Sequence, residues 1–172
     1  MLVSYTFANQ KDKKVIGETY PFISEEYTQG SDVLFFVFLS QGERIVPKAI
    51  GFTPIEKHNS KFYNWGFGDI VTNEETGEFE IDDETESNNG DVKTVFYTVV
   101  STLSKFFEFH PEATVHIEGS NRQRTRIYKG FINRYWGQIE PYYDVRGYAS
   151  GKIRDFEPGT EYEYLLISRK KT

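Results

Sequence analysis

The stretch TVHIEGSNRQRTRIYKGFINRYW, residues 114–136, decides the fold because it predicts a strand, a tight turn and a helix in immediate succession. Thr114–Glu118 alternates and is rich in β-branched residues, a pattern typical of a half-buried strand. Gly119 and Ser120 interrupt that strand, and a side-chain oxygen of Ser120 or Asn121 can cap the first free N–H groups of a helix. The stretch therefore predicts a strand–turn–helix unit.

The predicted helix combines an apolar face with many cations. Its apolar residues recur at helical spacing and predict one buried face, formed by Ile127, Tyr128, Phe131, Ile132 and Tyr135. Its positive charges come from Arg122, Arg124, Arg126, Lys129 and Arg134.

The arginines at the start of this helix suit recognition of a phosphate or carboxylate, because guanidinium groups bind such anions through two hydrogen bonds. By the step of about 100° per residue, Arg122 and Arg126 share a face, whereas Arg124 lies on another. The alternative is that these arginines form salt bridges with acidic residues, each contributing about 0–1 kcal/mol at the surface. We expect an exposed Arg122 that is open to a ligand, and a structural Arg126, since it adjoins Ile127.

Two further places offer polar groups to a ligand. The junction 88–93 puts Asn89 and Gly90 at a predicted helix start, although Asp91 could simply cap that helix. Asp69 ends a glycine-containing strand, where a ligand contact and a turn cap are equally good interpretations. The candidate ligand-binding residues are Asp69, Asn89, Gly90, Ser120, Asn121, Arg122, Arg124, Arg126 and Tyr128.

The composition indicates one globular domain spanning residues 1–172. Aromatic residues make up 17% of the chain and charged residues 27%, so core material is plentiful. The formal net charge of −6 argues against general nucleic-acid binding, which favours a basic surface. A small anionic ligand or a protein is the expected partner.

Several classes of site and location are disfavoured by the sequence. The chain has no cysteine, which excludes disulfides and thiol nucleophiles. His58, His110 and His116 lack metal-ligand spacing, the acidic segment 72–90 does not match a calcium loop, and no metal site is predicted. The longest apolar run, Val33–Leu39, is too short to cross a membrane, and the expected location is cytoplasmic.

The remaining pattern predicts an α+β fold, with a single twisted, mostly antiparallel sheet of about six to eight strands and two main helices packed on it. The clearest helix runs from Asp91 to about His110, with an apolar stripe from Val92 to Phe107. Val33–Leu39 is predicted to be a central strand buried on both sides, and an acidic hairpin is predicted around Thr76–Gly77. The other predicted strands are 15–24, 44–53, 62–70, 142–149 and 161–168, the first of them at an edge because of Pro21.

Three segments together resemble an uncharacterised bacterial family, domain-of-unknown-function family 6934. They are FYNWGFGDI (62–70), NNGDVKTVFYTVVSTLSKFF (88–107) and HIEGSNRQRTRIYKGFI (116–132), and the run GS-x-x-x-RTR-x-Y is the most specific part. The resemblance covers most of residues 15–170 and implies no established chemistry or cofactor.

The order strand–helix–strand–helix–strand from Phe62 to Ala149 is also similar to the second half of a Gcn5-related acetyltransferase. This likeness implies an anion-binding loop at 88–93 and a tyrosine near the thioester at Tyr128, but the loop lacks that family's Gly-rich pattern. Three functions stay open at this point: a binding or interaction domain with an anion site at 119–126, a degenerate acyltransferase, and an RNA-binding component of a toxin–antitoxin or phage-defence system.

Overall fold

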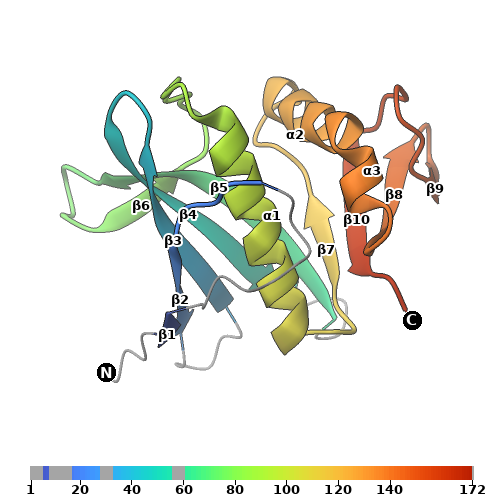
Figure 1. The fold of residues 1–172 in the computed structure, drawn as a ribbon, viewed down its shortest axis with the longest axis horizontal. Coiled ribbons are helices and arrows are strands. Elements are labelled where there is room, and N and C mark those ends of the chain that lie inside the picture. Colours follow the sequence, from blue (N-terminus) through green and yellow to red (C-terminus); the bar gives the residue numbers. More distant parts are fainter. Residues whose placement is uncertain (1–5, 8–16, 28–32, 56–60, 172) are drawn as a thin grey trace. The chain divides into compact units, whose positions relative to one another are not determined.

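The computed structural model describes residues 6–7, 17–27, 33–55 and 61–171. Within them the chain has an α+β fold built on one mostly antiparallel open sheet, which confirms the predicted fold class (Figure 1). The strand order is β1-β2-β3-β4-β5-β7-β10-β8-β9, and β6 pairs with β5 off this path. The described residues form ten strands, more than the six to eight predicted.

The elements follow one another along the chain with these bounds: β1 Thr6–Phe7, β2 Phe22–Tyr27, β3 Val33–Gln41, β4 Ile45–Pro54, β5 Phe62–Thr72, β6 Phe79–Asp82, α1 Val92–Phe109, β7 Thr114–Ile117, α2 Arg122–Arg134, α3 Trp136–Ile139, β8 Tyr143–Ala149, β9 Lys152–Asp155 and β10 Tyr164–Arg169. The acidic hairpin predicted around Thr76–Gly77 is confirmed, because β5 and β6 pair antiparallel across it.

The chain divides into two compact units, and each is discontinuous in sequence. The first unit comprises Met1–Thr53 and Gly66–Lys105, and the second comprises Pro54–Trp65 and Phe106–Thr172. The strand β5 and the helix α1 each contribute residues to both units. The single domain predicted from the sequence stays a prediction.

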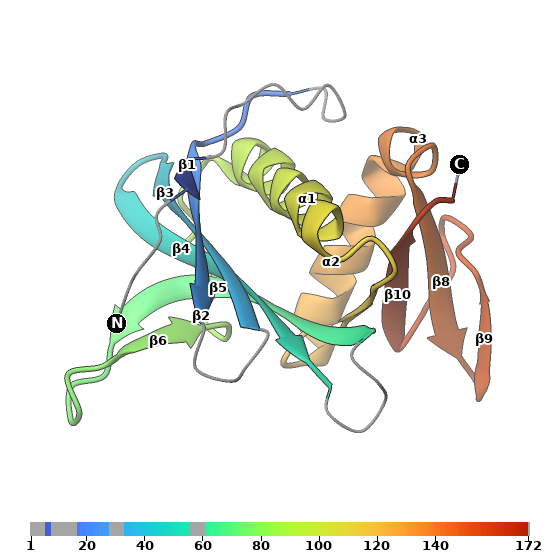
Figure 2. The ribbon, with the colours of Figure 1, turned by 90° about the horizontal axis from the view of Figure 1, so that it is seen from below.

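In the first unit, α1 covers one face of the strands (Figures 1 and 2). Val95, Phe96 and Leu103 of the predicted stripe are buried, whereas Val92 at its start is 60% exposed. Thr98 is fully buried although it lies outside the predicted stripe. Its hydroxyl accepts a hydrogen bond from the backbone N–H of Tyr20 at 2.8 Å, so the segment before β2 covers a second side of the helix.

The predictions for β2 and β3 need correction. The strand β2 begins only after Pro21, since proline cannot donate to a ladder, and it lies between β1 and β3 rather than at an edge. The strand β3 is buried on one face only: Phe36 is fully buried, but Leu39 is 45% exposed. The reason is that α1 covers a single face of these strands, while Phe35 on the other face packs over a glycine of β4.

In the second unit, α2 packs on one face of a sheet in which β7 lies between β5 and β10. The strand β7 pairs parallel with the start of β5 and antiparallel with β10. Trp65 of β5 meets Tyr128 of α2 edge to face, with ring centroids 4.8 Å apart. The alternating residues of β7 and β10 that face the helix are almost completely buried: Val115, Ile117, Leu165 and Ile167.

The buried side of α2 agrees only in part with the predicted face. Ile132 is buried and Tyr128, Phe131 and Tyr135 are half-buried, whereas Ile127 is 36% exposed. Arg124 and Lys129, which lie outside the predicted face, are buried as well, because long cationic side chains can bury their aliphatic stems while their polar ends find partners.

Candidate anion-binding site

The turn between β7 and α2 is closed by hydrogen bonds of its own residues. Asn121 is the N-cap, as one of the two sequence predictions had it, and its side-chain oxygen accepts from the backbone N–H of Arg124 at 2.9 Å. The Thr125 hydroxyl accepts from the Gly119 N–H at 3.0 Å and donates to the Asn121 carbonyl at 3.2 Å. The turn is therefore a fixed scaffold for the side chains around it.

The arginines at the start of α2 separate into two environments. Arg122 and Arg126 are exposed and lie four residues apart, so they occupy one face of the helix. Arg124, in contrast, is only 8% exposed. No hydrogen bond or ion pair joins the Arg122 side chain to another described residue. Two guanidinium groups on one exposed face can bind an anionic group together.

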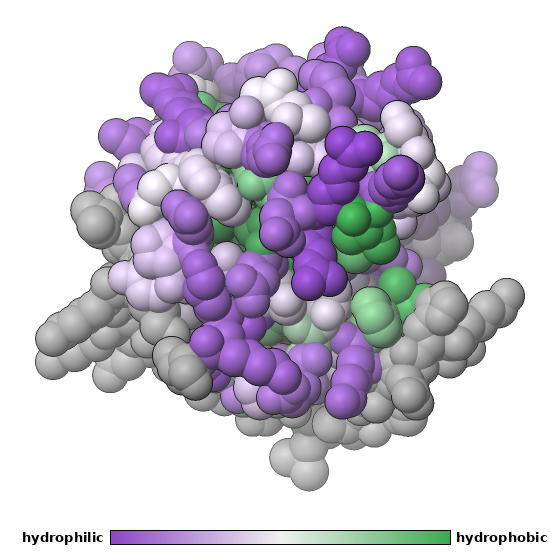
Figure 3. All heavy atoms as spheres, turned by 90° about the vertical axis from the view of Figure 1, so that its right-hand side faces the viewer, coloured by the Kyte–Doolittle hydropathy of each residue, from purple (hydrophilic) through white to green (hydrophobic). Residues whose placement is uncertain are grey.

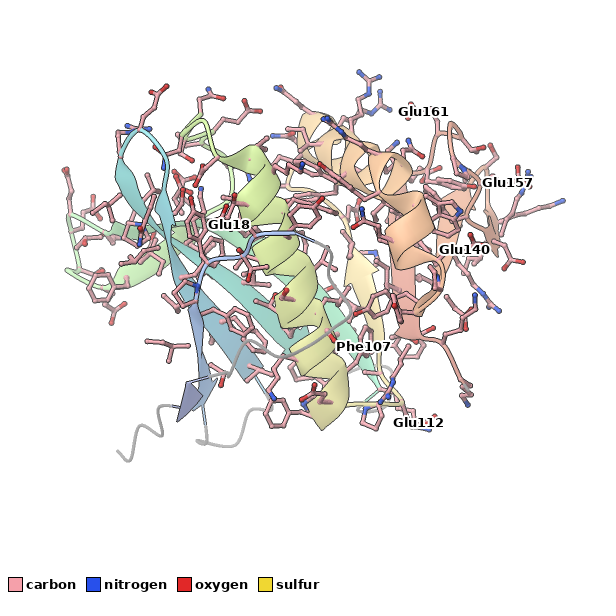
Figure 4. The ribbon with its side chains drawn as sticks, in the orientation of Figure 1. Glu18, Phe107, Glu112, Glu140, Glu157 and Glu161 are labelled. Atoms are coloured by element: carbon pink, nitrogen blue, oxygen red, sulfur yellow. The ribbon has the colours of Figure 1, made fainter. Side chains whose placement is uncertain are left out.

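Arg126 lies within the electrostatic range of Glu161, a residue that precedes β10 and lies beside α2 (Figure 4). The hydrogen bond and the charge of Lys129 lower the pKa of the Glu161 carboxyl, and the charge of Arg126 lowers it further. Lys129 is buried, and its Nζ donates to Glu161 at 2.6 Å and to the Tyr162 carbonyl at 2.9 Å. Lys129 thus anchors the segment before β10 to the helix.

The other candidates of the 119–128 segment have defined places. Ser120 is exposed in the turn. Tyr128 is half-buried, and its ring packs against Trp65.

Asp69 lies in the first unit and belongs to a buried ion pair. Its carboxylate accepts a hydrogen bond from Lys48 Nζ at 2.5 Å, and Lys48 also donates to the Ser87 hydroxyl at 2.9 Å. The Lys48 side chain is only 7% exposed and the Asp69 side chain 15%. A carboxylate already bound to a buried ammonium group supports the scaffold rather than a ligand.

Asn89 is also a structural residue of the first unit. Its side-chain oxygen accepts from the backbone N–H of Arg44, and its amide donates to the Ser40 hydroxyl and to the Arg44 carbonyl, each at 2.8 Å. Both the oxygen and the nitrogen of this amide are hydrogen-bonded to other residues of the fold, and these bonds join the β3–β4 turn to the segment before α1. Gly90 follows with a φ of 77°, a conformation that side-chain-bearing residues rarely adopt.

Asp91 immediately precedes α1, as predicted, and its carboxylate accepts hydrogen bonds from Tyr20 and Ser40 at 2.7 and 2.6 Å. Burial, together with the hydrogen bond to Asp91, raises the pKa of the Tyr20 phenol. A carboxylate at this helix start disfavours an incoming phosphate at residues 88–93.

Sequence reasoning missed several polar and aromatic residues with defined contacts. Lys48 and Lys129 looked like ordinary surface lysines, because burial of a lysine depends on partners far along the chain. The row of rings formed by His116, Tyr164 and Tyr148 crosses three strands. The alternation of Tyr148 and Tyr164 with buried strand residues could have placed both on one sheet face.

The histidines that the structure describes have aromatic neighbours. His110 Nδ1 lies 3.3 Å from the Tyr63 hydroxyl, and burial lowers the pKa of His116. His58 lies outside the described residues. Among the residues described, no group of three potential ligands is arranged to hold a metal ion.

None of the described helices combines the length and apolar character needed to cross a membrane.

One known protein family matches most of this chain. The model of a family of unknown function, DUF6934, matches residues 17–170, and the chain therefore belongs to that family. No curated protein matches the chain, and no solved structure does.

Proposed function

We propose that this member of the DUF6934 family is a binding domain whose ligand carries a phosphate or carboxylate held at the Gly119–Arg126 turn. The observation that supports it best is the exposed pair Arg122 and Arg126 beside a turn fixed by its own hydrogen bonds. The buried lysines Lys48 and Lys129, in contrast, already form ion pairs with carboxylates. Arg122 is the primary contact of the anionic group, because Arg126 already interacts electrostatically with Glu161.

The test is a melting-shift titration with inorganic pyrophosphate. A ligand at 100 times its dissociation constant adds about 2.7 kcal/mol of stability. The melting temperature should rise with pyrophosphate, and less so at high salt, because exposed charges are screened. Arg122→Ala should remove most of this shift and leave the unliganded melting temperature near that of the wild type.

Arg134→Ala is the matched control, since Arg134 is an exposed arginine at the opposite end of the same helix. An equal loss of the shift in both variants would mean that pyrophosphate binding depends only on the overall charge of the protein. If pyrophosphate raised the melting temperature of Arg122→Ala as much as that of the wild type, the proposed site would be rejected.

A degenerate acyltransferase is the second candidate, and the order of elements favours it. The strands β5 and β7 pair in parallel around α1, and α2 and β8 follow. The hydrogen-bonded Asn89 amide and the Asp91 carboxylate weigh against an anion-binding loop at α1. Acetyl-CoA in the same melting assay tests this candidate: a shift that survives Arg122→Ala would favour it over the anion site at the turn.

A further inference from the structure

The second unit has a sheet face that no described helix covers. Buried residues of β7, β10 and β8 alternate with half-buried or exposed ones. The buried set faces α2, as the contact of Trp65 with Tyr128 requires, and the other set forms what we call the outer face. This outer face comprises Phe62 and Asn64 of β5, Thr114 and His116 of β7, Leu166 and Ser168 of β10, Asp144 and Arg146 of β8, the tyrosines Tyr148 and Tyr164, and Ile153 of the edge strand β9.

Three aromatic rings form a continuous row across the outer face. Tyr164 and Tyr148 are direct cross-strand partners, and their rings stack with centroids 4.7 Å apart and an interplanar angle of 7°. His116 continues the row, with its ring centroid 4.6 Å from that of Tyr164. All three residues are only half-buried, and among the described residues Tyr148 stacks on no second ring, so one of its ring faces is available.

Carboxylates surround this aromatic row. Glu118 at the end of β7 has a side chain that is 52% exposed and lies 3.5 Å from His116 Nε2. Glu163 precedes Tyr164 and is exposed. Burial, the neighbouring Tyr148, and the charges of Glu163 and Glu118 all raise the pKa of the Tyr164 phenol.

The positive charge of Arg146, which lies on the outer face, is offset by neighbouring carboxylates. Arg146 Nε lies 3.8 Å from Asp155, and Asp144 is exposed on the same strand as Arg146. The face is therefore aromatic and acidic. The edge beside it, seen at β9, is mostly hydrophilic with a few hydrophobic side chains (Figure 3).

We propose that the outer face binds an arginine-rich segment of a partner protein, with one guanidinium group over the ring face of Tyr148 that does not stack on Tyr164, and with further guanidinium groups paired with Glu118 and Glu163. Cations are attracted to aromatic rings, and the planar guanidinium stacks on them better than an ammonium group does. Nucleic acid is the disfavoured occupant, because these carboxylates repel phosphates. This surface is separate from the arginine pair on α2, so the two proposals stand or fall independently.

The first experiment measures binding of a fluorescent octa-arginine peptide by anisotropy. The double substitution Glu118→Gln and Glu163→Gln should weaken binding about tenfold, as expected for the loss of two charges beside a cation on aromatic rings. The matched control is Glu74→Gln with Glu75→Gln, which removes two exposed carboxylates from the β5–β6 turn of the first unit. The control should bind within about twofold of the wild type. Equal weakening in both variants would show attraction to overall negative charge and overturn the proposal.

The second experiment tests the aromatic contribution with the unaltered protein, so it does not depend on a variant that folds. Octa-arginine should shift the ring resonances of Tyr148 and Tyr164, and octa-lysine should bind several-fold more weakly. Equal affinity for the two peptides, or resonance shifts confined to other residues, would overturn the stacking arrangement. Binding of a single-stranded RNA dodecamer that shifts the same ring resonances would replace the protein partner with nucleic acid.

Discussion

Replacing Gly119 by alanine tests how tightly β7 turns into α2. A Cβ at this position would lie 2.5 Å from the Thr125 backbone nitrogen and closer still to Arg124 Cβ. Real Cβ atoms do not approach backbone atoms this closely, so the turn must shift and its Gly119–Thr125 hydrogen bond must weaken. Overpacking of this kind costs about 1–3 kcal/mol. For a chain of this length the melting temperature should fall by about 2–12 °C.

Gly130→Ala is the control, because Gly130 lies within the same helix and a Cβ there would meet nothing within 4 Å. Alanine is favoured over glycine inside a helix by about 0.5–1 kcal/mol, so this variant should melt about 1–4 °C higher than the wild type. Both melting temperatures can be measured by circular dichroism at 222 nm, the usual helix signal. If Gly119→Ala melted at or above the wild-type temperature, the close approach of the turn to α2 would be refuted.

Three further predictions concern stability. Phe106→Ala should cost about 3–5 kcal/mol in urea unfolding, since Phe106 is fully buried against Tyr63, and a loss below about 1 kcal/mol would contradict this packing. Asp69→Ala should lower the free energy of unfolding by about 3–5 kcal/mol, because it leaves the charge of Lys48 buried and unpaired. Adding Lys48→Met should recover much of that loss. A smaller effect of Asp69→Ala would contradict a structural role of Asp69 and favour a role in ligand binding. Burial lowers the pKa of His116 below its ordinary 6.5, so the unfolded chain binds the proton more readily and stability should fall as the pH drops below about 6.5. Urea midpoints at pH 5 and 7 should show a smaller pH dependence in His116→Gln than in the wild type.

Helical periodicity located the two main helices from sequence because their apolar spacing is strong. The stripe of α1 is long enough to define its face even though Val92 is exposed. The face of α2 was predicted only in part, because buried Arg124 and Lys129 resemble surface residues in any single-sequence pattern. Their burial depends on partners such as Glu161, which the chain brings close only when it folds.

The short edge strands were missed for a different reason. All four residues of β9, Lys152–Asp155, are exposed, so no alternation of apolar and polar residues marks that strand. Its pairing with β8 comes from the Ser150–Gly151 turn, where both residues have positive φ. The cap at Asn121 could be predicted because it depends only on neighbouring residues. The role of Asp69 could not, because its partner Lys48 stands on another strand.

The discontinuity of the two compact units has a consequence for synthesis of the chain. Residues 62–65 of β5 leave the ribosome well before Thr114–Ile117, the strand with which they pair in the second unit. Until then Tyr63 and Trp65, which become buried in the finished fold, are open to contact with other chains. A product truncated after Lys105 would keep them in that state, so premature termination at this point should yield an aggregating polypeptide rather than a smaller folded one.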